Sequence, residues 1–137
     1  MKLVLDTNVL VSGIFWNGQP ARILELWTEG VFDLIVSYEI LDEYKRILRK
    51  IGIKYASNDL AESWIEFISQ NAILVDSPEI FKGCRDPHDN KFIDCAIASR
   101  AKIIISGDED LLSIKKVGNI IVVDCRKALD YLKHRSS

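Results

Sequence analysis

Long apolar runs are missing from this sequence. Its uninterrupted apolar stretches, such as Ile103–Ile105 and Ile120–Val123, have at most four residues, far short of the ~18 residues needed to span a bilayer. An acidic residue, Asp6, follows the first residues too early for the apolar region of a signal peptide. With no membrane or address signal, the expected compartment is the cytoplasm.

Cysteine and histidine are also scarce and poorly placed for ligation. Cys84, Cys95 and Cys125 form no CxxC pair, and His88 and His134 lie far apart. A zinc site or a dithiol redox motif is therefore not expected. The thiols suit small buried side chains in a reducing compartment.

Positive charge is not in excess either. The formal net charge is −2 and the sequence pI is about 5.7, so bulk electrostatics do not indicate a nucleic-acid-binding protein. A nucleic-acid substrate would require a bound cation and a local basic strip, for which Lys45–Lys50 and Lys54 are candidates. The alternative is a solvated helix end whose cations suit the helix dipole. Trp16, in a Gly- and Pro-bounded loop, is a candidate for stacking on a base or a partner.

The 137 residues fit one globular domain, 1–137, with 48% apolar and 28% charged residues. Short apolar runs alternate with amphipathic segments. Strands are predicted at residues 3–5, 34–36, 73–75, 103–105 and 120–123, and helices near 8–15, 21–28, 38–51, 60–68, 90–100, just after 108, and 127–133. This alternation predicts an α/β fold, a three-layer α/β/α sandwich around a parallel sheet of about five strands.

Two carboxylates directly follow predicted strands. Asp6 follows the first strand, and Asp108 follows the fourth after Ser106 and Gly107. In parallel sheets, sites lie beyond the carboxyl ends of strands where the strand order switches. Capping of the following helices is an equally good explanation for each aspartate alone.

Two further acids occupy helices. Asp94 is the only charge in the otherwise apolar segment 92–98, and an unpaired buried carboxylate is costly. It therefore needs a cation or a wet cleft. Glu43 lies at the edge of the apolar stripe of its helix, where a solvated charge is the simpler explanation until the other acids are considered.

Four acids without histidine or cysteine favour a hard, oxygen-preferring cation, Mg²⁺ or Mn²⁺. Such a cation supports phosphodiester hydrolysis, with carboxylates holding the metal and one of them accepting a proton from water. Asp6, Glu43, Asp94 and Asp108 are therefore the expected catalytic and metal-binding residues.

Three segments in order resemble the PIN domain. They are Leu5–Leu10 (LDTNVL), Asp86–Phe92 (DPHDNKF) and Ser106–Leu112 (SGDEDLL). The resemblance spans essentially the whole chain and is greatest to PIN proteins of bacterial and archaeal toxin–antitoxin pairs, relatives of the VapC ribonucleases. The opening DTN is weak alone, but three motifs in the right order are specific.

The resemblance implies strand order 3-2-1-4-5, metal-dependent cleavage of single-stranded RNA, and control by an antitoxin protein. It leaves the oligomeric state open, a homodimer included. The family acids fall on Asp6, Glu43, Asp94 (where many relatives have Glu) and Asp108. Supporting positions are Asn8, Ser106, Asp89 and Asp110. No core acid is missing, which disfavours a degenerate nuclease.

Other classes fit less well. A haloacid-dehalogenase-like phosphatase would need an acid where Asn8 stands, and the lysine of a receiver domain would follow its strand rather than precede it as Lys102 does. Neither GxGxxG nor GxxxxGK[ST] is present. The remaining alternative is a non-catalytic PIN-like scaffold that binds RNA or a protein partner.

Overall fold

Strands and helices alternate along the chain in the computed structural model, which describes residues 1–133; His134 lies outside this part. The elements are β1 (Lys2–Leu5), α1 (Thr7–Phe15), α2 (Gln19–Thr28), β2 (Asp33–Ser37), α3 (Tyr38–Lys54), α4 (Asn58–Asn71), β3 (Ile73–Val75), the 3₁₀ turn η1 (Pro87–Asp89), α5 (Asn90–Ser99), β4 (Ile103–Ile105), α6 (Glu109–Leu112), β5 (Lys116–Val117), β6 (Ile120–Val123) and α7 (Cys125–Lys133).

The sheet has the order β3-β2-β1-β4-β6-β5. All neighbours pair in parallel except β5 and β6. From β1 the chain adds β2 and β3 on one side, then returns to add β4 and β6 on the other. The strand order therefore switches between β1 and β4, where Leu5 is in register with Ile105.

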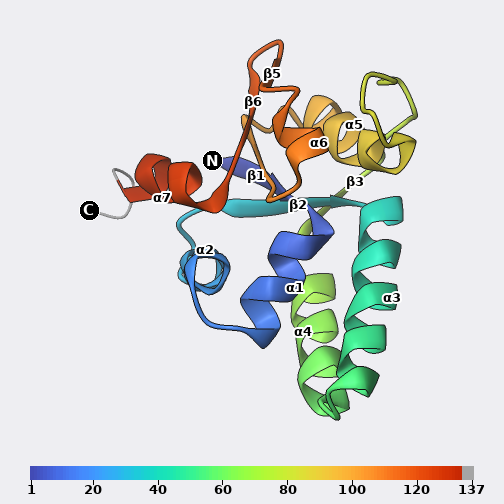
Figure 1. The fold of residues 1–137 in the computed structure, drawn as a ribbon, viewed down its shortest axis with the longest axis vertical. Coiled ribbons are helices and arrows are strands. Elements are labelled where there is room, and N and C mark those ends of the chain that lie inside the picture. Colours follow the sequence, from blue (N-terminus) through green and yellow to red (C-terminus); the bar gives the residue numbers. More distant parts are fainter. Residues whose placement is uncertain (134–137) are drawn as a thin grey trace.

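Helices cover both faces of the sheet (Figure 1). Helix α5 lies on one face against β1 and β2, whereas α1, α2, α3 and α4 lie on the opposite side. Because the central strands are covered twice, their side chains are apolar throughout and fully buried, as in Leu3–Leu5. The predicted α/β sandwich and the order of its five parallel strands are confirmed.

Strand β5 is the one addition to the predicted sheet. It is two residues long and returns antiparallel to β6 through Gly118 and Asn119. A two-residue strand shows no apolar periodicity, and this hairpin depends on Gly118, whose positive φ of 59° favours glycine. No helix among residues 1–133 is long and apolar enough to cross a membrane.

Candidate active site

The carboxyl ends of β1 and β4 bring Asp6 and Asp108 together. Asp6 follows β1, and its backbone N–H donates to the Ile105 carbonyl at 3.0 Å, which extends the pairing of β1 with β4 by one residue. Asp108 follows β4 after two residues. The two aspartates line one open pocket of about 260 Å³ at the switch point of the sheet.

Asp6 is both a helix cap and a pocket residue. Its Oδ1 accepts the Val9 N–H at 2.9 Å at the start of α1, and its Oδ2 accepts the Ser106 hydroxyl. Only 4% of its surface is exposed. Burial raises the pKa of Asp6, the hydrogen bonds from Ser106 and Val9 oppose that rise, and the nearby charge of Asp108 adds to it.

Asp108 is held in a similar way. Its N–H donates to Ser106 Oγ at 2.9 Å, and its Oδ1 accepts the Asp110 N–H at 3.0 Å as the cap of α6. The capping explanation is therefore correct for Asp6 and Asp108, but it does not compete with the pocket role. Capping uses one oxygen of each carboxylate and fixes its direction.

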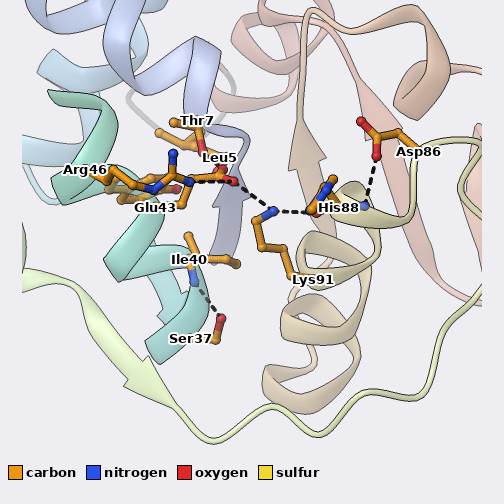
Figure 2. Close-up of polar contacts among 10 residues, drawn as sticks. Leu5, Thr7, Ser37, Ile40, Glu43, Arg46, Asp86, His88 and Lys91 are labelled. Atoms are coloured by element: carbon orange, nitrogen blue, oxygen red, sulfur yellow. Dashed lines mark hydrogen bonds and ion pairs between the residues drawn. The ribbon is translucent and has the colours of Figure 1, made fainter. Parts of the chain in front are cut away.

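Glu43 reaches the pocket from α3. Its Oε2 accepts the Thr7 hydroxyl, and its Oε1 lies 2.9 Å from Lys91 Nζ. Arg46 approaches the same Oε1 from the solvent side at 4.0 Å. Figure 2 shows Glu43 on α3 and Lys91 on α5 pointing toward each other. Glu43 is therefore paired with cations, although its position in the sequence suggested a solvated charge.

The turn before α5 adds Asp86 and Asp89. Asp86 caps the turn by accepting the His88 N–H at 3.0 Å. Asp89 Oδ2 is buried and has no hydrogen-bond partner among the described residues. The pKa of Asp89 is raised to about 6, first by burial and then by the charges of Asp108 and Asp86. An orphaned buried carboxylate oxygen of this kind is suited to a cation.

Asp94 does not line this pocket. Its Oδ1 accepts the backbone N–H groups of Ile80 and Phe81 at 3.1 and 2.7 Å, and only 5% of its surface is exposed. It faces a separate, adjoining cavity of about 480 Å³. The buried carboxylate thus finds partners in the loop after β3, a possibility that helical periodicity could not indicate.

The remaining predicted residues divide into two groups. Asn8 lines the pocket, and Ser106 is fully buried beneath it. Asp110 lies outside the pocket lining and contacts Arg85 at 3.4 Å.

The three cysteines are free thiols, and burial raises the pKa of Cys84 to about 11 and that of Cys95 to about 12, as expected for unreactive side chains.

Two residues of the basic strip on α3 have partners away from the pocket. Arg49 pairs with Glu62 of α4 at 2.9 Å, and Lys54 lies over the ring of Tyr55. Of the strip, Arg46 comes near the acids through Glu43. Trp16 is 48% exposed and makes an edge contact with Tyr55.

A divalent cation such as Mg²⁺ or Mn²⁺ requires several oxygen ligands around one position. Among residues 1–133, no three carboxylate, imidazole or thiol groups already converge as a metal site. The pocket is nonetheless lined by carboxylates and contains the unpartnered Asp89 Oδ2. Its oxygen ligands fit Mg²⁺ or Mn²⁺ in type, with Asp6, Glu43, Asp89 and Asp108 as the residues that would hold it.

Six residues of the pocket lining were missed by sequence reasoning: the polar Thr7, Asp86, His88 and Lys91, and the apolar Ile47 and Phe92. Thr7 and His88 lie inside motifs that were already recognised. Lys91 carried a usable signal, because a lysine within a largely apolar helix needs an anion nearby if it is buried.

Comparison with known proteins agrees with this arrangement. The family model described as "PIN domain" matches residues 2–110. The protein MJ1680 of Methanocaldococcus jannaschii, described as uncharacterized, is 35% identical over 136 residues, which covers 88% of this chain and 83% of that protein. The crystal structure of VapBC2 from Rickettsia felis bound to a promoter DNA fragment matches in fold, with a TM-score of 0.59 and 17% identity over 90% of this chain and 98% of that chain. The chain belongs to the PIN-domain family.

Proposed function

We propose that this protein is a metal-dependent endoribonuclease that cleaves single-stranded RNA. The observation that carries the proposal is that Asp6, Glu43, Asp89 and Asp108 all line one open pocket at the switch point of the sheet. PIN domains are generally nucleases, and the family match covers most of this chain.

In this proposal Mg²⁺ or Mn²⁺, when bound, activates a water molecule and offsets the charge of the attacked phosphate. The protein holds the ligands in place. Ser106 and the Val9 N–H fix Asp6, and Thr7 and Lys91 fix Glu43. Asp89 Oδ2, which has no hydrogen-bond partner among the described residues, is free to bind the cation, and one of the pocket carboxylates accepts a proton from water.

The RNA backbone needs positive charge that the protein as a whole does not provide. Arg46 lies beside Glu43 with an exposed side chain, and it is the residue of the α3 strip best placed to contact a phosphate. Phosphate contacts of this kind position the strand without selecting its sequence.

The test is cleavage of short single-stranded RNAs in Mg²⁺, in Mn²⁺ and in chelator. Asp6→Asn and Asp89→Asn should each lower the cleavage rate by about 100-fold or more, the size of effect typical of groups that act in proton transfer. The matched control is Asp42→Asn, because Asp42 is exposed on α3 next to Glu43. Binding of RNA without cleavage under all three conditions would instead support the non-catalytic scaffold.

We further propose that this nuclease is the toxin of a toxin–antitoxin pair, located in the cytoplasm and inhibited by a protein partner. The proposal rests on its likeness to VapC-type PIN proteins; the fold relative VapBC2 was crystallised as a complex on promoter DNA. Expression of the active protein alone should arrest growth, and expression of an Asp6→Asn variant should not. Harmless expression of a protein that cleaves RNA in vitro would refute the toxin role and leave the nuclease intact.

A further inference from the structure

Lys91 places a buried ammonium group inside the acid pocket. It is the second residue of α5, and only 7% of its surface is exposed. Its Nζ lies 2.9 Å from Glu43 Oε1, donates to the His88 carbonyl, and is 5.1 Å from the centroid of the Phe92 ring. Figure 2 shows this side chain between Glu43 on α3 and His88 on the turn before α5.

Neither helix stability nor ordinary ion-pair strength explains this position. A cation in the first turn of a helix is opposed by the helix dipole. Burial of both members of an ion pair carries a desolvation penalty that often cancels their attraction. The placement of Lys91 therefore needs a reason in the pocket it faces.

That reason is the charge of the pocket. The pocket is lined by five acids: Asp6, Glu43, Asp89, Asp108 and, at the start of the turn η1, Asp86. Among the described residues that line it, Lys91 is the sole lysine or arginine. Glu43 has its two oxygens engaged by Thr7 and Lys91. Lys91 therefore balances part of the negative charge that a divalent cation would otherwise neutralise alone.

We propose that Lys91 is the resident cation of the acid pocket. Its ammonium neutralises Glu43 when no metal is bound, stabilises the empty pocket, and lowers the affinity of the pocket for a divalent cation. Lys91 is thus a positioning residue that acts through Glu43. The inference rests on the proposed metal-dependent function and adds a residue that sets the strength of metal binding.

Direct measurement of Mn²⁺ binding tests the affinity. Free Mn²⁺ is followed by electron paramagnetic resonance during titration of the wild-type protein, Lys91→Met and Lys91→Arg. Loss of one positive charge a few ångströms from a divalent ion should tighten Mn²⁺ binding by about tenfold or more in Lys91→Met. Lys91→Arg, which keeps the charge, should stay near wild type.

Arg46→Met is the matched control. Arg46 contacts the same Glu43 oxygen, but at 4.0 Å and with 68% of its side chain exposed. Solvent screens such a charge, so this variant should change Mn²⁺ affinity by less than about threefold. Unchanged or weaker Mn²⁺ binding in Lys91→Met would overturn the proposal. If Lys91→Met does not fold, Lys91→Gln, which keeps a donor for Glu43, replaces it.

A double-mutant cycle in chelator tests the counter-ion role without metal. Lys91→Met should lower the melting temperature because it removes the cation at 2.9 Å from the partly buried Glu43 carboxylate, and Glu43→Gln added to it should restore part of the loss. Additive effects would overturn the counter-ion role. If no protein, wild type included, binds Mn²⁺, the proposed metal cofactor and the affinity effect both fail, and the cycle alone decides the pairing with Glu43.

Discussion

Ser106 and Asp6, which are 100 positions apart in the chain, are joined by a hydrogen bond from the Ser106 hydroxyl to Asp6 Oδ2. The same hydroxyl oxygen accepts the N–H of Asp108 at 2.9 Å. One fully buried hydroxyl therefore links the carboxylate after β1 to the carboxylate after β4. These two hydrogen bonds hold the Asp6 and Asp108 carboxylates close together, although their like charges repel each other.

Replacement of Ser106 by Ala should lower both stability and activity. It removes a donor to a buried carboxylate and an acceptor for the Asp108 N–H, and such losses typically destabilise by about 1–3 kcal/mol. Denaturant unfolding and RNA cleavage measure the two effects. Ser113→Ala is the control, because the Ser113 hydroxyl also donates a hydrogen bond, to the Asp110 carbonyl at 2.7 Å, but is exposed. Equal effects of the two variants would contradict a special role for Ser106.

Replacement of Asp94 by Asn should destabilise the protein whether or not Mn²⁺ is present. Asn keeps the acceptor oxygen for the Ile80 and Phe81 amides but loses the charge that strengthens both bonds. We expect a loss of about 1–2 kcal/mol, with the stabilisation by Mn²⁺ unchanged. Thermal melts in chelator and in Mn²⁺ measure both quantities. Loss of the Mn²⁺ effect would place Asp94 among the metal ligands, as its position in the motif predicts.

Replacement of Asp89 by Asn should stabilise the metal-free protein in a pH-dependent way. The pKa of Asp89 is raised from 3.8 to about 6 in the folded state. The folded protein therefore binds this proton more tightly than the unfolded chain, and the stability contributed by Asp89 falls as the pH rises through about 6. The variant lacks this loss, so it should melt above wild type at about pH 7 and approach it near about pH 4.

Melting curves in chelator across this pH range test the Asp89 prediction. Asp6, whose pKa is also raised, is present in both proteins and cancels in the difference. Mn²⁺ should reverse the order at about pH 7, because only the wild type retains the full ligand set. An offset between the two proteins that is independent of pH would refute the titration of Asp89.

Mn²⁺ should raise the melting temperature of the wild-type protein. A ligand that binds only the folded state at ~100 times its Kd stabilises by about 2.7 kcal/mol, which corresponds to several degrees for a chain of this size. Asp6→Asn should lose most of this shift, although the asparagine side-chain oxygen can still accept the Val9 N–H and cap α1. A wild-type melting curve that does not respond to millimolar Mn²⁺ would contradict the metal site.

The apolar periodicity of this sequence determined the architecture. Runs such as Ile103–Ile105 are apolar at every position, which is typical of strands covered on both faces. The amphipathic stripe of α3 in turn predicted which side of that helix faces the core. The sequence pattern located the helix ends only to within one or two residues. The first residue of a helix depends on which side chain caps it, as Asp6 caps α1 and Ser37 caps α3.

Residue type and strand-end position also identified Asp6 and Asp108, because a parallel sheet gathers its carboxyl ends at one edge. Only the tertiary structure decided which other acids line the same pocket as Asp6 and Asp108. Asp89 and Asp94 are five residues apart, yet one faces the pocket and the other binds the loop after β3. The pairing of Lys91 with Glu43 joins α3 to α5 across 48 positions. Local periodicity cannot determine such a contact, because it depends on how two helices from separate parts of the chain pack around the same strands.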